Sequence, residues 1–283
     1  MPLTPGTLLP CFFHRLLACL GTLLLSASAT QADPASADAW QSALNLDYNA
    51  AAATLETQYR ADTESPRIAI AYATSLLVRD PTTSQNVVEA QRILESLLTR
   101  LAADETAHRP VAIYLLGRIA HDHVEPARLD VAKSRYVQLR QDYPNHPLAE
   151  QSAVHLAYIV SLHEPPRDPR QGIAAVENLL ADTNSPSARR ELHFLIAHLH
   201  WHGRGDAAAA LPHYIAGREI GFEAPYRNSE VDLTIAGLAD ELGRDELAAQ
   251  HYMAFVEAQP RDGRAQTARR LADEARARLA EQP

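Results

Sequence analysis

The sequence predicts an all-α protein, an α-solenoid of about six helical hairpins that ends in a single C-terminal capping helix. Three observations lead to this prediction: a composition that favours helix, two recurring pairs of side chains, and chain-breaking residues between them. The chain has 283 residues with only 11 glycines, and 6% of its residues are aromatic. It is rich in Ala, Leu and Arg, which lose little conformational freedom in a helix.

An alanine followed four residues later by a large side chain recurs six times. Successive alanines are 35 to 43 residues apart. Because side chains four apart lie one above the other on a helix, each pair lies on one helix face. The small residue lets a neighbouring helix approach, and the large residue fills the space beside it. The pairs are Ala51–Leu55, Ala90–Leu94, Ala132–Tyr136, Ala175–Leu179, Ala210–Tyr214 and Ala248–Tyr252.

A second marker, a large apolar residue directly followed by a small one, precedes five of these pairs. The markers are Tyr72-Ala73, Leu116-Gly117, Leu156-Ala157, Ile196-Ala197 and Ile235-Ala236. Prolines and glycines such as Pro81, Pro126 and Gly243 stand between the two kinds of marker and indicate turns. Each unit is therefore predicted to be a helix, a short turn and a second helix. One such hairpin cannot bury its apolar face alone, so consecutive units are expected to stack.

Residues 261–283 are predicted to form a capping helix and tail after a repeat region at residues 33–260. A terminal unit needs a polar outer face. The remaining faces of this helix carry Arg, Asp and Glu. Its apolar stripe at helical spacing is formed by Ala265, Ala268, Leu271, Ala275 and Leu279.

Residues 1–32 are interpreted as a secretory signal peptide. Arg15 precedes an apolar run, Leu16 to Leu25, that is too short to cross a hydrocarbon layer of about 30 Å. Small residues suited to signal peptidase follow at Ala27 and Ala29. No other segment approaches about 20 uninterrupted apolar residues, so no membrane span is expected. The predicted location is periplasmic or secreted.

Both cysteines, Cys11 and Cys19, lie in this leader. Its removal would leave no thiol for a disulfide, a nucleophile or a metal site. Leu16-Leu17-Ala18-Cys19 loosely resembles the lipobox of bacterial lipoproteins. A lipid anchor at Cys19 is not favoured, because the apolar run continues to Leu25 and because Leu17 stands where a small residue is usual. It remains the alternative to soluble export.

Charge and motif content argue against nucleic-acid binding and catalysis. The net charge is −9, and nearly every Arg-rich stretch also carries Asp or Glu. A phosphate backbone is instead bound through clustered Lys and Arg. The sequence has no glycine-rich phosphate loop and no Gly-x-Ser-x-Gly motif. We therefore expect neither an enzyme nor a bound cofactor.

The hairpin pattern resembles the tetratricopeptide repeat over residues 35–262. The last unit matches the family's large-small pair, turn glycine, packing alanine, aromatic and terminal proline at Ile235-Ala236, Gly243, Ala248, Tyr252 and Pro260. Residues 211–222, which precede this unit, also resemble the related Sel1 repeat. The resemblance implies a scaffold that binds a partner protein or peptide in a concave groove.

In tetratricopeptide repeats the first helix of each hairpin lines this groove. Aromatic residues and Arg dominate binding energy at interfaces, which makes them the candidates to look for there. Tyr114 and Phe194 could equally be buried between helices. Counted from the large-small markers, the predicted groove residues are Tyr114, Arg118, His121, Tyr158, His198, Trp201 and His202.

Histidines gather between residues 193 and 213. His198 and His202 are one turn apart and could present two imidazoles to a metal, with Asp206 or His213 as a third ligand. The apolar residues between them do not suggest a polar site. We therefore expect surface or groove histidines and no metal, and a metal-binding helical enzyme stays as a less favoured alternative.

One junction between two repeats indicates a cellular location. The stretch from Tyr143-Pro144-Asn145 to Leu156-Ala157 resembles the junction of bacterial envelope proteins, namely the BamD type of outer-membrane assembly lipoprotein and the periplasmic Tol-Pal coordinator. This resemblance implies a partner in the cell envelope. It also supplies a rival function, a lipid-anchored structural component of an outer-membrane assembly complex.

Overall fold

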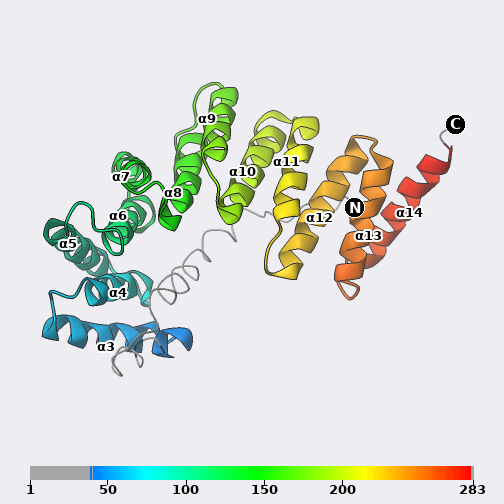
Figure 1. Cartoon of the computed structure of the whole chain (residues 1–283). Helices are drawn as coiled ribbons and strands as arrows, with labels where there is room; N and C mark the ends of the chain where they lie inside the picture. The colour runs from blue at the N-terminus through cyan, green and yellow to red at the C-terminus, as the bar shows by residue number, and fades with distance from the viewer. Residues whose placement is uncertain (1–38, 40, 282–283) are drawn as a thin grey trace. The chain divides into compact units, whose positions relative to one another are not determined.

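The computed structural model describes residue 39 and residues 41–281, and all regular elements in this part of the chain are helices (Figure 1). The predicted signal peptide at residues 1–32, and Cys19 within it, lie outside the described residues. Within the described part of the chain, no helix is both long enough and apolar enough to cross a membrane. The predicted all-α fold of helices packed in consecutive pairs is confirmed.

Contacts divide the described residues into two compact units, which meet in the sequence at Ser152 and Ala153. In the N-terminal unit, α3 packs on α4, α4 on α5, α5 on α6 and α6 on α7. The π-helical turn η1 directly continues α6. The elements are α3 (Tyr48–Ala61), α4 (Pro66–Val78), α5 (Ser84–Arg100), α6 (Arg109–Arg118), η1 (Ile119–His123), α7 (Leu129–Asp142) and the first part of α8 (Pro147–Tyr158).

The C-terminal unit begins within α8 and contains two complete hairpins and a final helix. The helices α10 and α11 pack side by side, as do α12 and α13 (Figure 1). The remaining elements are η2 (Ile159–His163), α9 (Pro169–Ala181), α10 (Pro186–Arg204), α11 (Ala207–Ile220), α12 (Pro225–Glu241), α13 (Asp245–Ala258) and α14 (Ala265–Glu281).

Local sequence signals set where the helices begin and end. The side chains of Asp47, Ser65 and Thr83 each accept a hydrogen bond from a backbone N–H in the first turn of the helix that follows. Proline opens α4, α9, α10 and α12, where its missing N–H leaves no hydrogen bond unmade. Gly205 ends α10 in the left-handed region at φ 66°.

The large-small markers on the first helices are all in the core. The large members, from Tyr72 to Ile235, are at most 7% exposed, and the alanines beside them are fully buried. Five of the six alanine pairs on the second helices are buried as well. These side chains therefore form the contact between the two helices of each hairpin, as the spacing predicted.

The α9 pair is an exception. Ala175 and Leu179 are only half-buried, whereas Gly172 and Val176, three residues earlier, are buried. A Cβ on Gly172 would lie 3.5 Å from the ring of Pro166, which is an ordinary van der Waals contact. The prediction for α9 was therefore displaced by about one helical turn.

A second glycine contact is found in the α10–α11 hairpin. A Cβ on Gly217 of α11 would lie 2.5 Å from Cε1 of Phe194 on α10, so the ring occupies the space that a side chain would need. The ring of Phe194 also lies 6.1 Å from that of Tyr214. In the α6–α7 hairpin, Tyr114 and Tyr136 have nearly the same ring separation, 6.2 Å.

The final helix, α14, packs on α13 through small residues. Its buried side chains are Ala265, Ala268, Ala272 and Ala275, and Leu271 lies beside them half-buried. The side chain of Leu279, which the predicted stripe included, is 38% exposed. The helix thus buries one narrow alanine face and leaves its charged faces to solvent.

Candidate binding surface

The N-terminal unit does not place the three predicted groove residues on its surface. Tyr114, Arg118 and His121 are 2%, 7% and 6% exposed. The rings of Tyr114 and His121 each lie 6.2 Å from the ring of Tyr136 on α7, so they pack into the hairpin. Because these side chains are buried, the structure does not present them on the surface of a groove.

Arg118 is held in this interior by a carboxylate one turn along the chain. Its Nε donates to Oδ2 of Asp122 in η1 at 2.5 Å. Burial acts to lower the pKa of the guanidinium, but Tyr114, and after it Asp122, more than offset this and the pKa is raised. Because the guanidinium is buried and already paired with Asp122, it is not accessible to a partner.

The C-terminal unit exposes an aromatic surface on the last turns of α10, which we call the α10 cluster: His198, Trp201 and His202. His202 is exposed, and the other two side chains are half-buried. The ring of His202 lies 4.5 Å from that of Trp201 and 4.7 Å from that of His198. The indole also meets Tyr214 of α11 edge-on at 6.2 Å.

One histidine of the α10 cluster, His198, is uncharged at neutral pH. Burial, and after it the neighbouring His202, lowers the pKa of His198 to about 4. Tyr158, the remaining predicted groove residue, lies half-buried at the end of α8 against the core of this unit. Burial and then the charge of Glu191 raise its pKa. The surface therefore offers an indole ring and imidazole rings that can form apolar contacts and hydrogen bonds.

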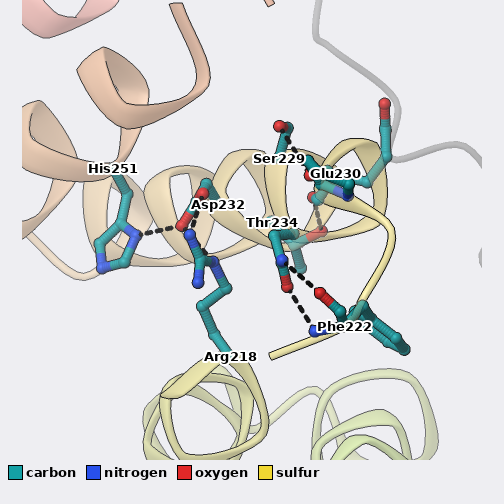
Figure 2. A network of polar contacts seen from close by, with 9 residues as sticks. Arg218, Phe222, Ser229, Glu230, Asp232, Thr234 and His251 are labelled. Carbon is teal, nitrogen blue, oxygen red and sulfur yellow. Dashed lines mark hydrogen bonds and ion pairs between the residues drawn. The ribbon is translucent and has the colours of Figure 1, made fainter. Parts of the chain in front are cut away.

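A polar network that the sequence analysis missed joins α11, α12 and α13 (Figure 2). Asp232 is 2% exposed and accepts two hydrogen bonds from Arg218, each 2.9 Å long. Nδ1 of His251 lies 2.9 Å from the same carboxylate. No sequence motif marks this aspartate, because its partners are 14 and 19 residues away.

Each unit has a shallow cleft at an equivalent place in the repeat. The cleft beside Asp232 has a volume of about 430 Å³ and lies between α11 and α13 over the start of α12. The other has a volume of about 280 Å³ and lies between α5 and α7 over the start of α6. In both places the second helices of two successive hairpins flank the first helix of the later hairpin. The clefts are therefore features of the repeat and do not mark one specialised site.

Two arginines that the sequence analysis also missed close the ends of second helices. Nη1 of Arg109 donates to the carbonyl groups of Leu98 and Leu101 at the end of α5. Arg189 makes the same contacts with Leu180 and Thr183 at the end of α9. Such contacts satisfy carbonyl groups that a helix end leaves without partners.

The histidines of residues 193–213 separate into two groups. His198 and His202 belong to the α10 cluster, and Asp206 caps α11 by accepting from the N–H of Ala209. Asp206 therefore serves as a helix cap and does not join His198 and His202, the pair that the sequence analysis weighed as metal ligands and did not favour. A second group instead forms where His193 and His213 meet, with Nδ1 to Nδ1 at 3.1 Å.

Burial keeps this second group neutral. It lowers the pKa of His193 to about 4, and His213 and then Arg189 add to the effect. Burial, followed by the neighbouring His200, also lowers the pKa of His213, while Glu177 acts in the opposite direction. Neutral imidazoles have a lone pair to share, so this group can accept a hydrogen bond or bind a cation.

Comparison with known proteins identifies the type of fold but no protein family. No profile of a known protein family matches the sequence, and no curated protein matches it either. Among solved structures, the chain is similar to the C-terminal part of a TPR repeat-containing protein from Cytophaga hutchinsonii. That match has a TM-score of 0.54 and 14% identity over 87% of this chain and 86% of the other.

The fold is therefore of the tetratricopeptide-repeat type. The chain also resembles the APC/C hetero-tetramer Cut9-Hcn1, with a TM-score of 0.49 and 13% identity over 90% of this chain and 45% of the other.

Proposed function

We propose that the chain is an exported, non-catalytic scaffold that binds a partner protein or peptide of the cell envelope through the α10 cluster. The observation that supports this most directly is the accessible aromatic surface around Trp201 on a first helix of a tetratricopeptide-type fold. Trp is among the residues whose truncation weakens interfaces most. An aromatic surface of this kind suits an apolar side chain of the partner, flanked by hydrogen bonds to the imidazoles.

Export is the part of the proposal that rests on residues 1–32. Arg15 and the apolar run Leu16 to Leu25 have the order of a secretory signal. The rival is a lipid-anchored component of an outer-membrane complex, for which Cys19 would be the attachment site. Mass spectrometry of the mature N-terminus separates the two. A start near Thr30 or Asp33 supports soluble export, and a lipid-modified Cys19 supports the rival.

The binding surface is tested by partner recovery from envelope extracts. Trp201→Ala should reduce recovery of a specific partner about tenfold or more, as expected for the loss of a central aromatic contact. Tyr226→Ala is the matched control, because it truncates an aromatic side chain that is 48% exposed on α12 of the same unit. Equal recovery by wild type and Trp201→Ala would contradict this surface.

A further inference from the structure

Three possible metal ligands from three different helices converge in the C-terminal unit. Glu177 on α9, His200 on α10 and His213 on α11 each have a ligand atom, and these atoms all lie within 4.8 Å of one another. The rings of His200 and His213 are nearly parallel, with centroids 6.1 Å apart. The grouping depends on the packing of the helices and is therefore independent of the His198–His202 spacing.

His213 also has the outer contact that ligating histidines usually make. A histidine that binds a metal through one ring nitrogen donates its other N–H to a neighbouring acceptor, which fixes the orientation of the ring. Nδ1 of His213 lies 3.1 Å from Nδ1 of His193. When His213 donates this proton to His193, its Nε2 keeps a lone pair for an ion.

His200 has a buried nitrogen with unused hydrogen-bonding capacity. Within the described part of the chain, its Nδ1 is buried and makes no hydrogen bond. Buried polar atoms nearly always have a partner, and leaving one without costs stability. If an ion is bound between the three helices, the ring of His200 is one of its ligands.

We propose that Glu177, His200 and His213 form a binding site for a divalent transition-metal ion of the zinc type. Two imidazoles and one carboxylate are a ligand set that zinc accepts, with a fourth position left for water or a group from a partner. Calcium and magnesium prefer oxygen ligands, so the two nitrogens select against them. No sequence motif or structural neighbour suggests this site, and it goes beyond the scaffold function.

Small side-chain movements would complete the coordination. Bonds of about 2.1 Å in a tetrahedral site place ligand atoms about 3.4 Å apart. The carboxylate of Glu177 is on an exposed side chain and is therefore able to close the difference by changing its rotamer. The ion would then tie α9 of one hairpin to both helices of the next.

The test uses untagged protein that has been treated with chelator and dialysed, because a histidine tag would bind the same ions. Calorimetric titration with Zn²⁺ should show one site, and Co²⁺ should give visible absorption bands from the same site. Glu177→Gln and His213→Gln should each weaken binding more than about tenfold. His193→Gln should weaken it by about 10- to 100-fold, as is usual for loss of an outer contact.

His198→Gln is the matched control, because it removes a histidine of the same helix that lies outside the proposed site. It should leave both the Zn²⁺ affinity and the Co²⁺ spectrum unchanged, and Zn²⁺ should raise the melting temperature of this variant as it does that of wild type. No binding by wild type would overturn the proposal. Equal binding by Glu177→Gln and wild type, or loss of the site in His198→Gln, would also overturn it.

Discussion

The ring of Tyr136 on α7 occupies the space in which Gly117 on α6 would carry a side chain. A Cβ on Gly117 would lie 2.7 Å from Cε1 of this ring, and the ring is fully buried. The small member of one marker and the large member of the other therefore meet directly. The α6–α7 hairpin is held at this spacing because one of the two residues has no side chain.

We expect Gly117→Ala to destabilise the N-terminal unit. The added methyl group must push a buried ring aside, and overpacking of this kind costs about 1–3 kcal/mol. The expected result is a lower urea midpoint, measured by circular dichroism. Gly237→Ala is the control, because Gly237 lies in α12 with no neighbouring atom within 4 Å of the place that an added methyl group would take. That variant should gain about 0.5–1 kcal/mol from helix propensity, and equal stability of Gly117→Ala and wild type would contradict the contact.

Removal of Asp122 should destabilise the N-terminal unit more strongly. Asp122→Ala leaves the buried guanidinium of Arg118 without its carboxylate, and breaking such a pair costs about 3–5 kcal/mol. Thermal unfolding checks the expected loss. Glu89→Ala removes a pair with Arg92 that is 37% and 59% exposed, so it should cost only about 0–1 kcal/mol.

A double variant tests whether the charge itself is responsible. In Arg118→Met with Asp122→Leu, the buried charge of Arg118 and its carboxylate partner are both absent and the volume of the side chains is kept, so most of the lost stability should return. A double variant that is as unstable as Asp122→Ala would show that the pair acts through something other than burial of charge.

The C-terminal unit should lose stability in mild acid. His193 and His198 have folded pKa values of about 4, below the ordinary histidine value of 6.5. Between these values the unfolded chain binds protons that the folded chain does not bind. Their contribution is therefore fully present above about pH 6.5 and decreases as the pH falls toward 4.

Urea midpoints measured across this pH range test the expectation. His198→Gln should show a smaller loss between pH 6.5 and 4 than wild type, because it removes one of the histidines whose pKa is lowered in the folded state. A slope in His198→Gln as steep as that in wild type would rule out this residue as a cause.

Asp232→Asn should weaken the contacts among α11, α12 and α13. It keeps the shape of the side chain but removes the charge that binds Arg218 through two hydrogen bonds. Hydrogen bonds to charged groups contribute about 1.5–3 kcal/mol, and a loss of that order should appear in chemical unfolding. Asp273→Asn, in a pair whose side chains are 54% and 65% exposed, should change stability little.

Much of the fold was predictable because burial repeats at a fixed helical spacing. The large-small markers identify which residues form the core of each hairpin, and the structure buries all five of them. The α9 marker was displaced because Gly172–Val176 and Ala175–Leu179 both have a small residue four positions before a large one. A shift of about one turn leaves such a pattern unchanged, so the sequence alone does not distinguish them.

The binding residues were harder to predict because a small rotation of a helix about its axis changes whether a side chain points to the surface or to the interior. Arg118 is an interfacial residue type, yet Asp122 makes its burial possible, and the π-helical geometry of η1 changes the direction of His121. Glu177 was missed for a different reason: its neighbours in space are 23 and 36 residues away. The proposed role of Glu177 as a metal ligand depends on which helices pack together.

The ring-over-glycine contacts also set which helices of this chain are interchangeable. Tyr114 corresponds to Phe194, because each stands three positions before the small member of its marker, and by the same counting Leu139 corresponds to Gly217. A recombinant hairpin of α6 followed by α11 would keep a glycine beneath each ring. The reciprocal hairpin of α10 followed by α7 would instead face Phe194 with Leu139, leaving no room for the ring. Exchange of helices between these repeats is therefore directional, and only whole hairpins would serve as freely transferable modules.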